Sequence, residues 1–317
     1  MTTPDADVLI VGAGSAGLSA ALMLARSRRR VIVLDGGSPR NAVAAEMHGV
    51  IGRDGWSPLD LVATGRDEVM RYGATIEPHA ATSVQRDDAH FVVTLDDGTT
   101  RSTRRLLVAA GLRDELPEIP GLAAHWGWGL AHCPYCHGWE VRDLRIAVIA
   151  TGPASLHQVQ LVRQLSPTVT YFVEDTDLSE TGLAALVARG IHVERRRIAA
   201  VLDVGGVLSG LRLRDDAELG FDAVFVRPRA VPGDQLLHTL GARSARGVDD
   251  HDWVSVDATG RTSVPGVWAA GNVVDPSATV PVSAAAGSTA GAAINADLVE
   301  DEVLSALRAH IPQKENR

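Results

Sequence analysis

The sequence has very little cysteine and lysine, few aromatic residues and no long hydrophobic run. Cysteine occurs twice in 317 residues, and aromatic residues make up 4% of the chain. Lysine occurs once, as Lys314, and every other basic residue is arginine. We attribute that bias to the base composition of the genome. Because no run of about eighteen apolar residues is present, a membrane-spanning helix is excluded.

Length and charge narrow the class of protein further. A chain of 317 residues with 45% apolar and 22% charged residues describes a globular protein with material for two domains. The formal net charge of −9 argues against a general nucleic-acid-binding protein. Residues 1–7 are short and polar, and the apolar run at 8–11 is too short for a signal peptide. We therefore expect a cytoplasmic protein with neither a membrane nor a nucleic acid as partner.

Both cysteines fall in one stretch, HCPYCHGWE, as Cys133 and Cys136. The C-x-x-C spacing is that of a dithiol that can close on itself, with one sulfur attacking and the other resolving. His132 and His137 flank the pair, and an imidazole beside a thiol can take its proton near neutral pH. Pro134 is well placed to be the first residue of a helix, with Cys133 as the N-cap. At that position the unpaired backbone N–H groups and the helix dipole stabilise a thiolate.

Three other interpretations of this stretch were weighed. An inert core pair is disfavoured by the proline, tyrosine and histidines around the cysteines. A permanent disulfide is disfavoured by the expected cytoplasmic location. A zinc site could draw four ligands from the two cysteines and two histidines. Adjacent residues cannot readily all point at one metal, and no second C-x-x-C or H-x-x-x-H completes a tetrahedron. Redox chemistry without a metal is the interpretation that we carry forward.

The N-terminal residues predict a dinucleotide-binding unit. An apolar strand at 7–11 runs into Gly12, Gly14 and Gly17 in a G-x-G-x-x-G pattern, followed by a helix at 18–25 and a strand at 31–34. Asp35 ends that second strand at the spacing of a ribose-binding acid. The glycines allow the tight turn, the approach of a pyrophosphate and close packing of helix on strand. An ordinary βαβ unit with a glycine turn is the alternative.

Other segments predict a second nucleotide-type unit and a domain boundary. A loop at 36–58 suits wrapping around a large dinucleotide, and two prolines and a glycine at 116–121 indicate a boundary. A second βαβ begins near 145, and a further strand with a glycine turn lies at 266–275. We also predict helices at 59–71, 154–165 and 283–307 and strands at 74–76, 82–85, 91–95, 105–108, 145–150, 169–173, 191–193 and 223–226.

Taken together, these motifs resemble the thioredoxin-reductase-like flavoproteins over nearly the whole chain. The resemblance is carried by Gly12–Gly17, Ala109–Gly111, the C-x-x-C in an inserted domain and Gly266–Asp275. His137 follows the second cysteine where thioredoxin reductases typically have aspartate. In this feature the chain is similar to the flavin-dependent dithiol oxidases that close disulfides in natural products such as holomycin, gliotoxin and romidepsin.

The resemblance implies a fold and a cofactor. The expected fold is α/β, with two Rossmann-like, three-layer ββα nucleotide-binding domains, the second inserted in the first, as in thioredoxin reductase. Residues 1–113 and 233–317 would form the FAD-binding domain, and 114–232 the inserted NAD(P)-type domain that carries the redox pair. A homodimer is also implied. The positions that match FAD contacts of the family are Gly12, Gly14, Ser15, Ala16, Gly17, Asp35, Gly36, Arg40, Asn41, His48, Gly111, Gly271, Asn272 and Val282.

The second nucleotide turn separates a reductase from an oxidase. An NADPH-dependent reductase needs glycines in this turn and arginines for the 2′-phosphate. Here Ala150 and Ser155 stand in the turn, and Glu174 and Asp175 follow the next strand. Two carboxylates would repel a 2′-phosphate, although an acid could still bind the ribose of NADH. Electrons are therefore expected to enter from a thiol substrate.

The resulting hypothesis is a dithiol oxidase. A small-molecule dithiol would attack the disulfide at Cys133 and leave as a closed disulfide, and Cys136 would pass two electrons to FAD. His137 would accept the proton, with His132 as the competing base, and O2 would be reduced to hydrogen peroxide. An NAD(P)H-dependent disulfide reductase and a non-catalytic flavin sensor are the alternatives. The nearby tryptophans would line the substrate pocket or pack in the core: Trp126, Trp128 and Trp139.

Overall fold

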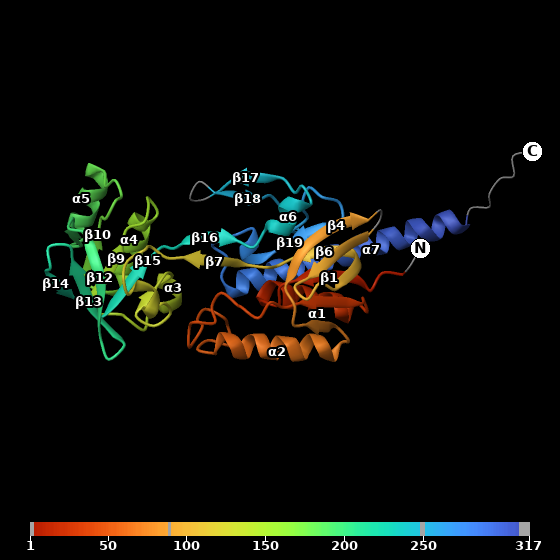
Figure 1. Cartoon of the computed structure of the whole chain (residues 1–317), viewed down its shortest axis with the longest axis horizontal. Helices are drawn as coiled ribbons and strands as arrows, with labels where there is room; N and C mark the ends of the chain where they lie inside the picture. Colours follow the sequence, from red (N-terminus) through yellow and green to blue (C-terminus); the bar gives the residue numbers. More distant parts are fainter. Residues whose placement is uncertain (1–2, 88–89, 248–250, 311–317) are drawn as a thin grey trace, which may run out of the picture. The chain divides into compact units, whose positions relative to one another are not determined.

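The computed structural model describes residues 3–87, 90–247 and 251–310, and the chain divides into two compact units. Unit 1 comprises Met1–Pro39, Leu59–Leu112 and Pro232–Arg317, and unit 2 comprises Arg40–Pro58 and Arg113–Val231. The chain passes between them at residues 39–40, 58–59, 112–113 and 231–232. The last two crossings lie in two paired strands, β7 (Leu112–Glu115) and β16 (Arg229–Pro232) (Figure 1).

The segment Arg40–Pro58 differs from its expected place. The sequence assigned it to the FAD-binding domain as part of 1–113, whereas its contacts place it in unit 2. Arg40 forms a two-pronged ion pair with Asp114, with Nε 2.7 Å from Oδ2 and Nη2 2.8 Å from Oδ1. A Cβ on Gly127 would lie only 2.6 Å from the carbonyl oxygen of Val43, so the two backbones pack closely. These long-range contacts have no local sequence signal.

The central sheet of unit 1 has the strand order β3-β2-β1-β6-β5-β4, with β19 also paired with β6. The pairings of β1, β2, β3, β6 and β19 are parallel, and β4 and β5 add an antiparallel hairpin. The long β6 pairs with β5 through one half and with β19 through the other. The strands are β1 (Ala6–Val11), β2 (Val31–Leu34), β3 (Thr75–Glu77), β4 (Ala81–Asp87), β5 (His90–Leu95), β6 (Thr100–Val108) and β19 (Val267–Ala269).

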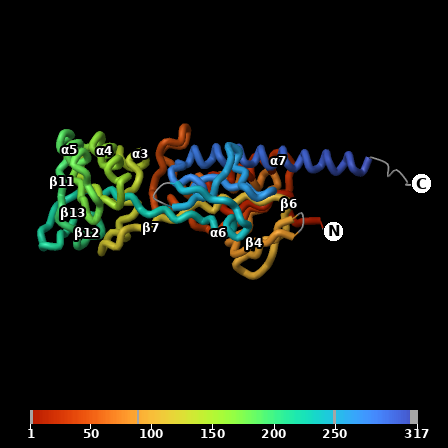
Figure 2. Tube along the Cα trace, turned by 90° about the horizontal axis from the view of Figure 1, so that it is seen from above, coloured from red at the N-terminus to blue at the C-terminus, as the bar shows by residue number. Residues whose placement is uncertain are grey.

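Alternating side chains of the central strands fill two cores in unit 1. Val8 and Ile10 pack on one face with residues of α1 and α7, and Leu9 and Val11 pack on the other. Figures 1 and 2 show α7 running beside α1 and continuing past it toward the C-terminus. The remaining elements of this unit are α1 (Ser15–Arg26), α2 (Pro58–Arg71), α6 (Gln235–Thr239), β17 (Ser244–Arg246), β18 (Asp252–Val254), η3 (Gly271–Val273) and α7 (Val280–His310).

Unit 2 has a parallel sheet between helices and a second, antiparallel sheet. The parallel sheet has the order β11-β10-β9-β15-β8. Ile146 and Val148 of β9 face a core that includes residues of α4 and α5, while Ala147 and Ile149 face a core with β12 and β13. The elements are η1 (Leu122–His125), β8 (Leu130–Ala131), α3 (Pro134–His137), β9 (Ile146–Ile149), α4 (Ser155–Leu165), β10 (Val169–Phe172), α5 (Glu180–Ala188), β11 (His192–Glu194), β12 (Ile198–Val204), β13 (Val207–Leu213), β14 (Glu218–Gly220) and β15 (Ala223–Val226).

The expected α/β fold with two Rossmann-type units is confirmed. Most predicted elements lie within a few residues of their observed bounds, and the strands at 31–34 and 223–226 match them. The sequence interpretation assigned no element to α5, β12, β13 or β14. Within the described residues, no helix combines the length and the apolar character needed to cross a bilayer.

Candidate active site

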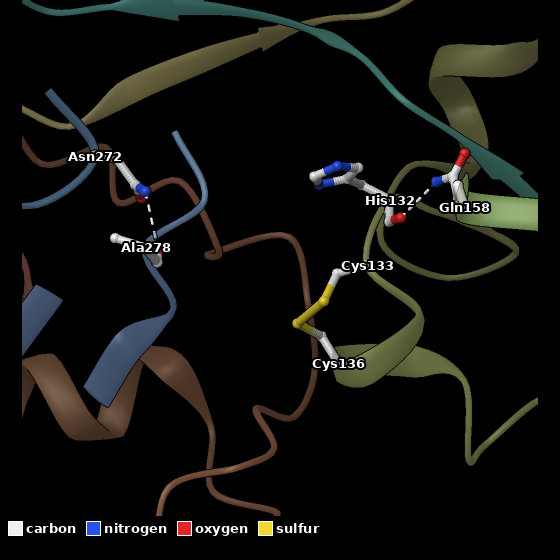
Figure 3. Close-up of a disulfide and its surroundings, with 6 residues drawn as sticks. All are labelled: His132, Cys133, Cys136, Gln158, Asn272 and Ala278. Atoms are coloured by element: carbon white, nitrogen blue, oxygen red, sulfur yellow. Dashed lines mark hydrogen bonds between the residues drawn. A yellow bond between two sulfur atoms is a disulfide. The ribbon is translucent and has the colours of Figure 1, made fainter. Parts of the chain in front are cut away.

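The cysteine pair lies at the start of a single helical turn in unit 2. Cys133 is the N-cap of α3 and Pro134 its first residue, as the sequence predicted. Cys133 and Cys136 form a disulfide with their Cα atoms 5.2 Å apart (Figure 3). The backbone N–H groups of Cys136 and His137 each donate to the Cys133 carbonyl at 3.1 Å. Because α3 is only four residues long, its dipole is small.

His137, directly after Cys136, is a half-buried residue. Neither ring nitrogen is exposed to solvent, and neither has a hydrogen-bond partner among the residues that the structure describes. Burial lowers the pKa of His137, because a protonated ring would lose its hydration. The Glu140 carboxylate acts in the opposite direction and His48 in the same direction. The ring is therefore held neutral at physiological pH, the state that a proton acceptor requires.

The stretch before the disulfide is held by a residue that the sequence interpretation did not single out. Gln158 of α4 is buried, and its Nε2 donates to the backbone carbonyl of His132 at 2.7 Å (Figure 3). This bond ties the residue before Cys133 to the helix that follows β9. The only signal in the sequence was that Gln158 is a polar residue on the inner face of an amphipathic helix. The sequence does not show which group Gln158 contacts.

The three predicted cofactor residues in the segment Arg40–Pro58 all belong to unit 2. The Arg40 guanidinium pairs with Asp114, and the Asn41 carbonyl accepts from the N–H of Ala44 at 3.1 Å. His48 lies near Glu140, with its Nε2 3.4 Å from Oε1 of that residue. The structure thus groups His48 with the cysteine stretch, whereas the glycine turn at Gly12 belongs to unit 1.

The glycine turn of unit 1 has the geometry of a nucleotide-binding loop. Gly12 has φ +105°, and a Cβ there would lie 2.3 Å from the Ala109 carbonyl oxygen. A Cβ on Gly17 would lie 1.8 Å from the Gly12 carbonyl oxygen, so helix and turn pack in contact. A Cβ on Gly14, by contrast, would have no heavy atom of the described residues within 4 Å, apart from those of its chain neighbours. The helix α1 has no side-chain cap and no acidic residue in its first turn, which leaves its N-terminus suited to a phosphate.

Asp35 ends β2 beside this turn. One carboxylate oxygen accepts from the N–H of Gly37 at 2.8 Å, and the other pairs with Arg66 of α2. The acid is therefore held in a defined orientation, although Arg66 competes for it with any ribose hydroxyl. Gly36, the residue after it, has only the Ala80 side chain near its Cβ position, at 3.7 Å.

Residues distant in sequence converge on the same turn. A Cβ on Gly271, which has φ +79°, would lie 2.9 Å from the Cβ of Ala16, next to Ser15. Gly111 has φ +69° and lies shortly after the end of β6. It is two residues after Ala109, whose carbonyl oxygen faces Gly12. Nδ2 of Asn272 donates to the carbonyls of Asp275 and Ala278, at 2.9 Å each (Figure 3). Val282 lies in the first turn of α7 and is exposed.

The corresponding turn of unit 2 is closed by the chain itself. The N–H of Thr151 donates to Oγ of Ser155 at 3.0 Å, and the Thr151 hydroxyl donates to the Arg227 carbonyl at 2.7 Å. Ser155 is fully buried. The Glu174 carboxylate accepts from the N–H of Ile198 at 3.0 Å, and burial raises the pKa of that carboxyl group. Asp175 pairs with Arg197. Thr151, Ser155, Glu174 and Asp175 therefore each have a partner within the chain.

The tryptophans near the disulfide differ in their surroundings. Trp126 is half-buried and packs against the core beside β12 and β13. Trp128 and Trp139 are largely exposed, and so is Tyr135 inside the C-x-x-C. The Arg142 guanidinium lies 4.2 Å from the centre of the Trp139 ring.

Comparison with known proteins places the chain among flavoenzymes. The model of the pyridine nucleotide-disulphide oxidoreductase family matches residues 6–291. Thioredoxin reductase sirT of Leptosphaeria maculans is 30% identical, over 91% of this chain and 93% of its own length. Thioredoxin reductase tcpT of Claviceps purpurea is 31% identical, over 95% and 96%. The crystal structure of HlmI superposes with a TM-score of 0.92 at 46% identity, covering 96% of this chain and 95% of that one.

Proposed function

Since the chain belongs to the pyridine nucleotide-disulphide oxidoreductase family, as a thioredoxin-reductase-like flavoenzyme, we propose that it is an FAD-dependent dithiol oxidase. It closes an intramolecular disulfide in a small-molecule, natural-product dithiol, with O2 as the acceptor and hydrogen peroxide as the second product. We also propose that it acts in the cytoplasm as a homodimer. His137 after the second cysteine and the resemblance to natural-product dithiol oxidases support this function.

The observation that carries the proposal is the closed nucleotide turn of unit 2. A reductase must take electrons from a nicotinamide nucleotide, which needs free backbone N–H groups and a free ribose acid. Ser155 takes the N–H of Thr151, and the Glu174 carboxylate is bound to the backbone at Ile198. Both features support entry of electrons from a thiol substrate at the Cys133–Cys136 pair.

The residues of unit 2 account for the thiol chemistry. His137 takes the proton of a substrate thiol, and the thiolate attacks Cys133 while the Cys133–Cys136 bond breaks. The second substrate thiol attacks the mixed disulfide, releasing Cys133 and the closed product. One disulfide is then formed in the substrate and one is reduced in the enzyme. The flavin, when bound, supplies the two-electron step that returns the pair to its oxidised state.

The residues of unit 1 fit the adenosine and pyrophosphate of FAD. The open space at Gly14 and the uncapped start of α1 suit the pyrophosphate, and Asp35 suits the ribose. Gly271 packs against Ala16 in the glycine turn. Asn272, the next residue, therefore also lies near this turn.

Anaerobic mixing tests the proposed function. Dithiothreitol should bleach the flavin absorbance of the purified protein, and the colour should return when air is admitted. Under air, about one oxygen should be consumed and one peroxide formed per disulfide closed, because the flavin carries two electrons per cycle. NADPH and NADH should leave the flavin oxidised. Rapid bleaching by either nucleotide would identify a reductase and contradict the proposal.

A further inference from the structure

Residues 132–138, the redox segment, are held at both ends by one helix of unit 2. Gln158 lies in the first half of α4, and its Nε2 donates to the backbone carbonyl of His132 at 2.7 Å (Figure 3). Leu165 is the last residue of α4 and packs against Gly138, where a Cβ would lie only 2.2 Å from Cδ1 of Leu165. Gln158 and Leu165 are about two helical turns apart and therefore lie on one face of α4.

Gln158 is a polar residue in apolar surroundings. It is 6% exposed, and its neighbours Val159 and Val162 are fully buried in the core beside β9 and β10. Its Oε1 is buried and has no hydrogen-bond partner among the residues that the structure describes. A buried amide costs free energy unless it is hydrogen-bonded, and an apolar side chain would fill the same space at lower cost. The donation to the carbonyl of His132 is therefore what the amide contributes here.

This hydrogen bond fixes the backbone at Cys133. The carbonyl of His132 and the nitrogen of Cys133 belong to one planar peptide unit, so holding the oxygen holds that plane. Farther along the redox segment, the N–H of Cys136 donates to the carbonyl of Cys133 at 3.1 Å, and the N–H of Gly138 donates to the carbonyl of Pro134 at 3.0 Å. The backbone and α4 therefore place the two cysteines, in addition to the bond between their sulfur atoms.

We propose that Gln158 is a positioning residue for the redox pair, which keeps Cys133 close to Cys136 after the bond between them has opened. A segment freed at one end would gain conformational entropy in the dithiol state, and that gain opposes closing. A segment held by α4 presents its two sulfurs to each other at a high effective concentration. Gln158 therefore shifts the equilibrium of the pair toward the disulfide. The inference rests on the proposed function only in taking Cys133 and Cys136 as the redox-active group.

Exchange with dithiothreitol measures this equilibrium. Its dithiol is oxidised to a cyclic disulfide while the Cys133–Cys136 bond is reduced to two thiols, so two electrons and two protons pass to the enzyme. The flavin-containing full chain is equilibrated without oxygen in mixtures of the two forms of dithiothreitol. Iodoacetamide then traps the thiols, and mass spectrometry gives the fraction of reduced pair. In Gln158→Met, which removes the donor at similar length, the equilibrium constant for disulfide formation should fall about two- to tenfold, the effect of one net hydrogen bond.

Two further variants show whether the effect belongs to this contact. Gln158→Asn keeps an amide but is one methylene group too short to reach the same carbonyl. It should shift the constant in the same direction, and it replaces Gln158→Met if that variant does not fold. Gln164→Met makes the same exchange at an exposed position of α4 and should leave the constant unchanged. A purely structural hydrogen bond would be lost from both redox states alike, so its removal would lower the melting temperature without moving the equilibrium.

The outcomes separate this inference from the proposed function. If Gln158→Met and Gln158→Asn keep the wild-type constant, or if Gln164→Met shifts it as far, Gln158 does not position the pair. If the constant falls as expected but NADPH bleaches the flavin, the oxidase is wrong and the role of Gln158 stands. If dithiothreitol never opens the pair in the wild-type protein, the pair is not redox-active and both are wrong.

Discussion

At the scale of single residues, position relative to solvent distinguishes side chains that look equivalent in the sequence. His132 and His137 flank the cysteines symmetrically, yet His137 has both ring nitrogens buried, and burial lowers its pKa. The carbonyl of His132 is held by Gln158 of α4. A neutral ring at His137 is the state that the proposed proton acceptor requires.

Replacing each cysteine in turn tests the division of labour within the pair. Both Cys133→Ser and Cys136→Ser should abolish multiple turnover, since one sulfur alone cannot cycle through a disulfide. Cys133→Ser should leave Cys136 able to form a charge-transfer absorbance band with oxidised flavin, measured by visible spectroscopy. If Cys136→Ser shows the band instead, the order of attack is reversed.

At the scale of elements, unit 1 depends on helices that approach each other through small residues. A Cβ on Gly287 of α7 would lie 1.9 Å from the carbonyl oxygen of Ala16 in α1, and a Cβ on Gly291 would lie 2.9 Å from that of Ala20. Side chains at these positions would separate the helices. Arg105 of β6 pairs with Asp297 and Asp301 farther along α7, which holds the helix on the unit. The close contact keeps Gly271 next to Ala16, and with it the predicted cofactor site.

Two glycine substitutions separate packing from cofactor binding. Gly287→Ala should destabilise the protein by about 1–3 kcal/mol, because the added methyl group meets backbone atoms that cannot move away easily. Gly14→Ala should leave the melting temperature of the flavin-free protein nearly unchanged, since its Cβ points into open space, but should reduce the flavin content. Thermal denaturation and flavin absorbance measure the two effects. A Gly14→Ala protein that retains full flavin would show that the cofactor does not approach this turn.

At the scale of the whole molecule, the chain contains the same nucleotide-binding design twice, with different outcomes. The turn of unit 1 has three glycines and open space at Gly14, whereas both helices that follow the two turns begin without a side-chain cap. The turn of unit 2 is closed by Ser155, and the acids after its second strand are bound to Ile198 and Arg197. One unit is suited to a dinucleotide, and the other retains the fold and carries the redox pair.

The glycine turn and Asp35 of unit 1 predict which flavin the protein binds. Purified protein should be yellow and release about one FAD per chain on denaturation, and not FMN, because the glycine turn and Asp35 suit a pyrophosphate and an adenosine ribose that FMN lacks. Chromatography of the released flavin measures this directly. A stoichiometric content of FMN would contradict the proposed roles of Gly14 and Asp35.

The features that the sequence alone determined are local ones. The glycine turn at Gly12, the strand that ends in Asp35 and the helix that begins at Pro134 each depend on backbone conformation and spacing within a few residues. Ala150 and Ser155, which stand where a nucleotide-binding turn would have glycine, are local features of the same kind. Such features are visible because the steric freedom of glycine, the fixed φ of proline and the alternation of apolar residues act along the chain.

The tertiary structure alone decided which distant residues meet. It grouped the segment Arg40–Pro58 with unit 2, and it brought His48 next to Glu140. It also supplied the bond from Gln158 to the carbonyl of His132. These contacts depend on ion pairs and close backbone packing between segments far apart in sequence. No local propensity encodes them, because each arises only when the whole unit buries its cores and leaves particular charged groups side by side.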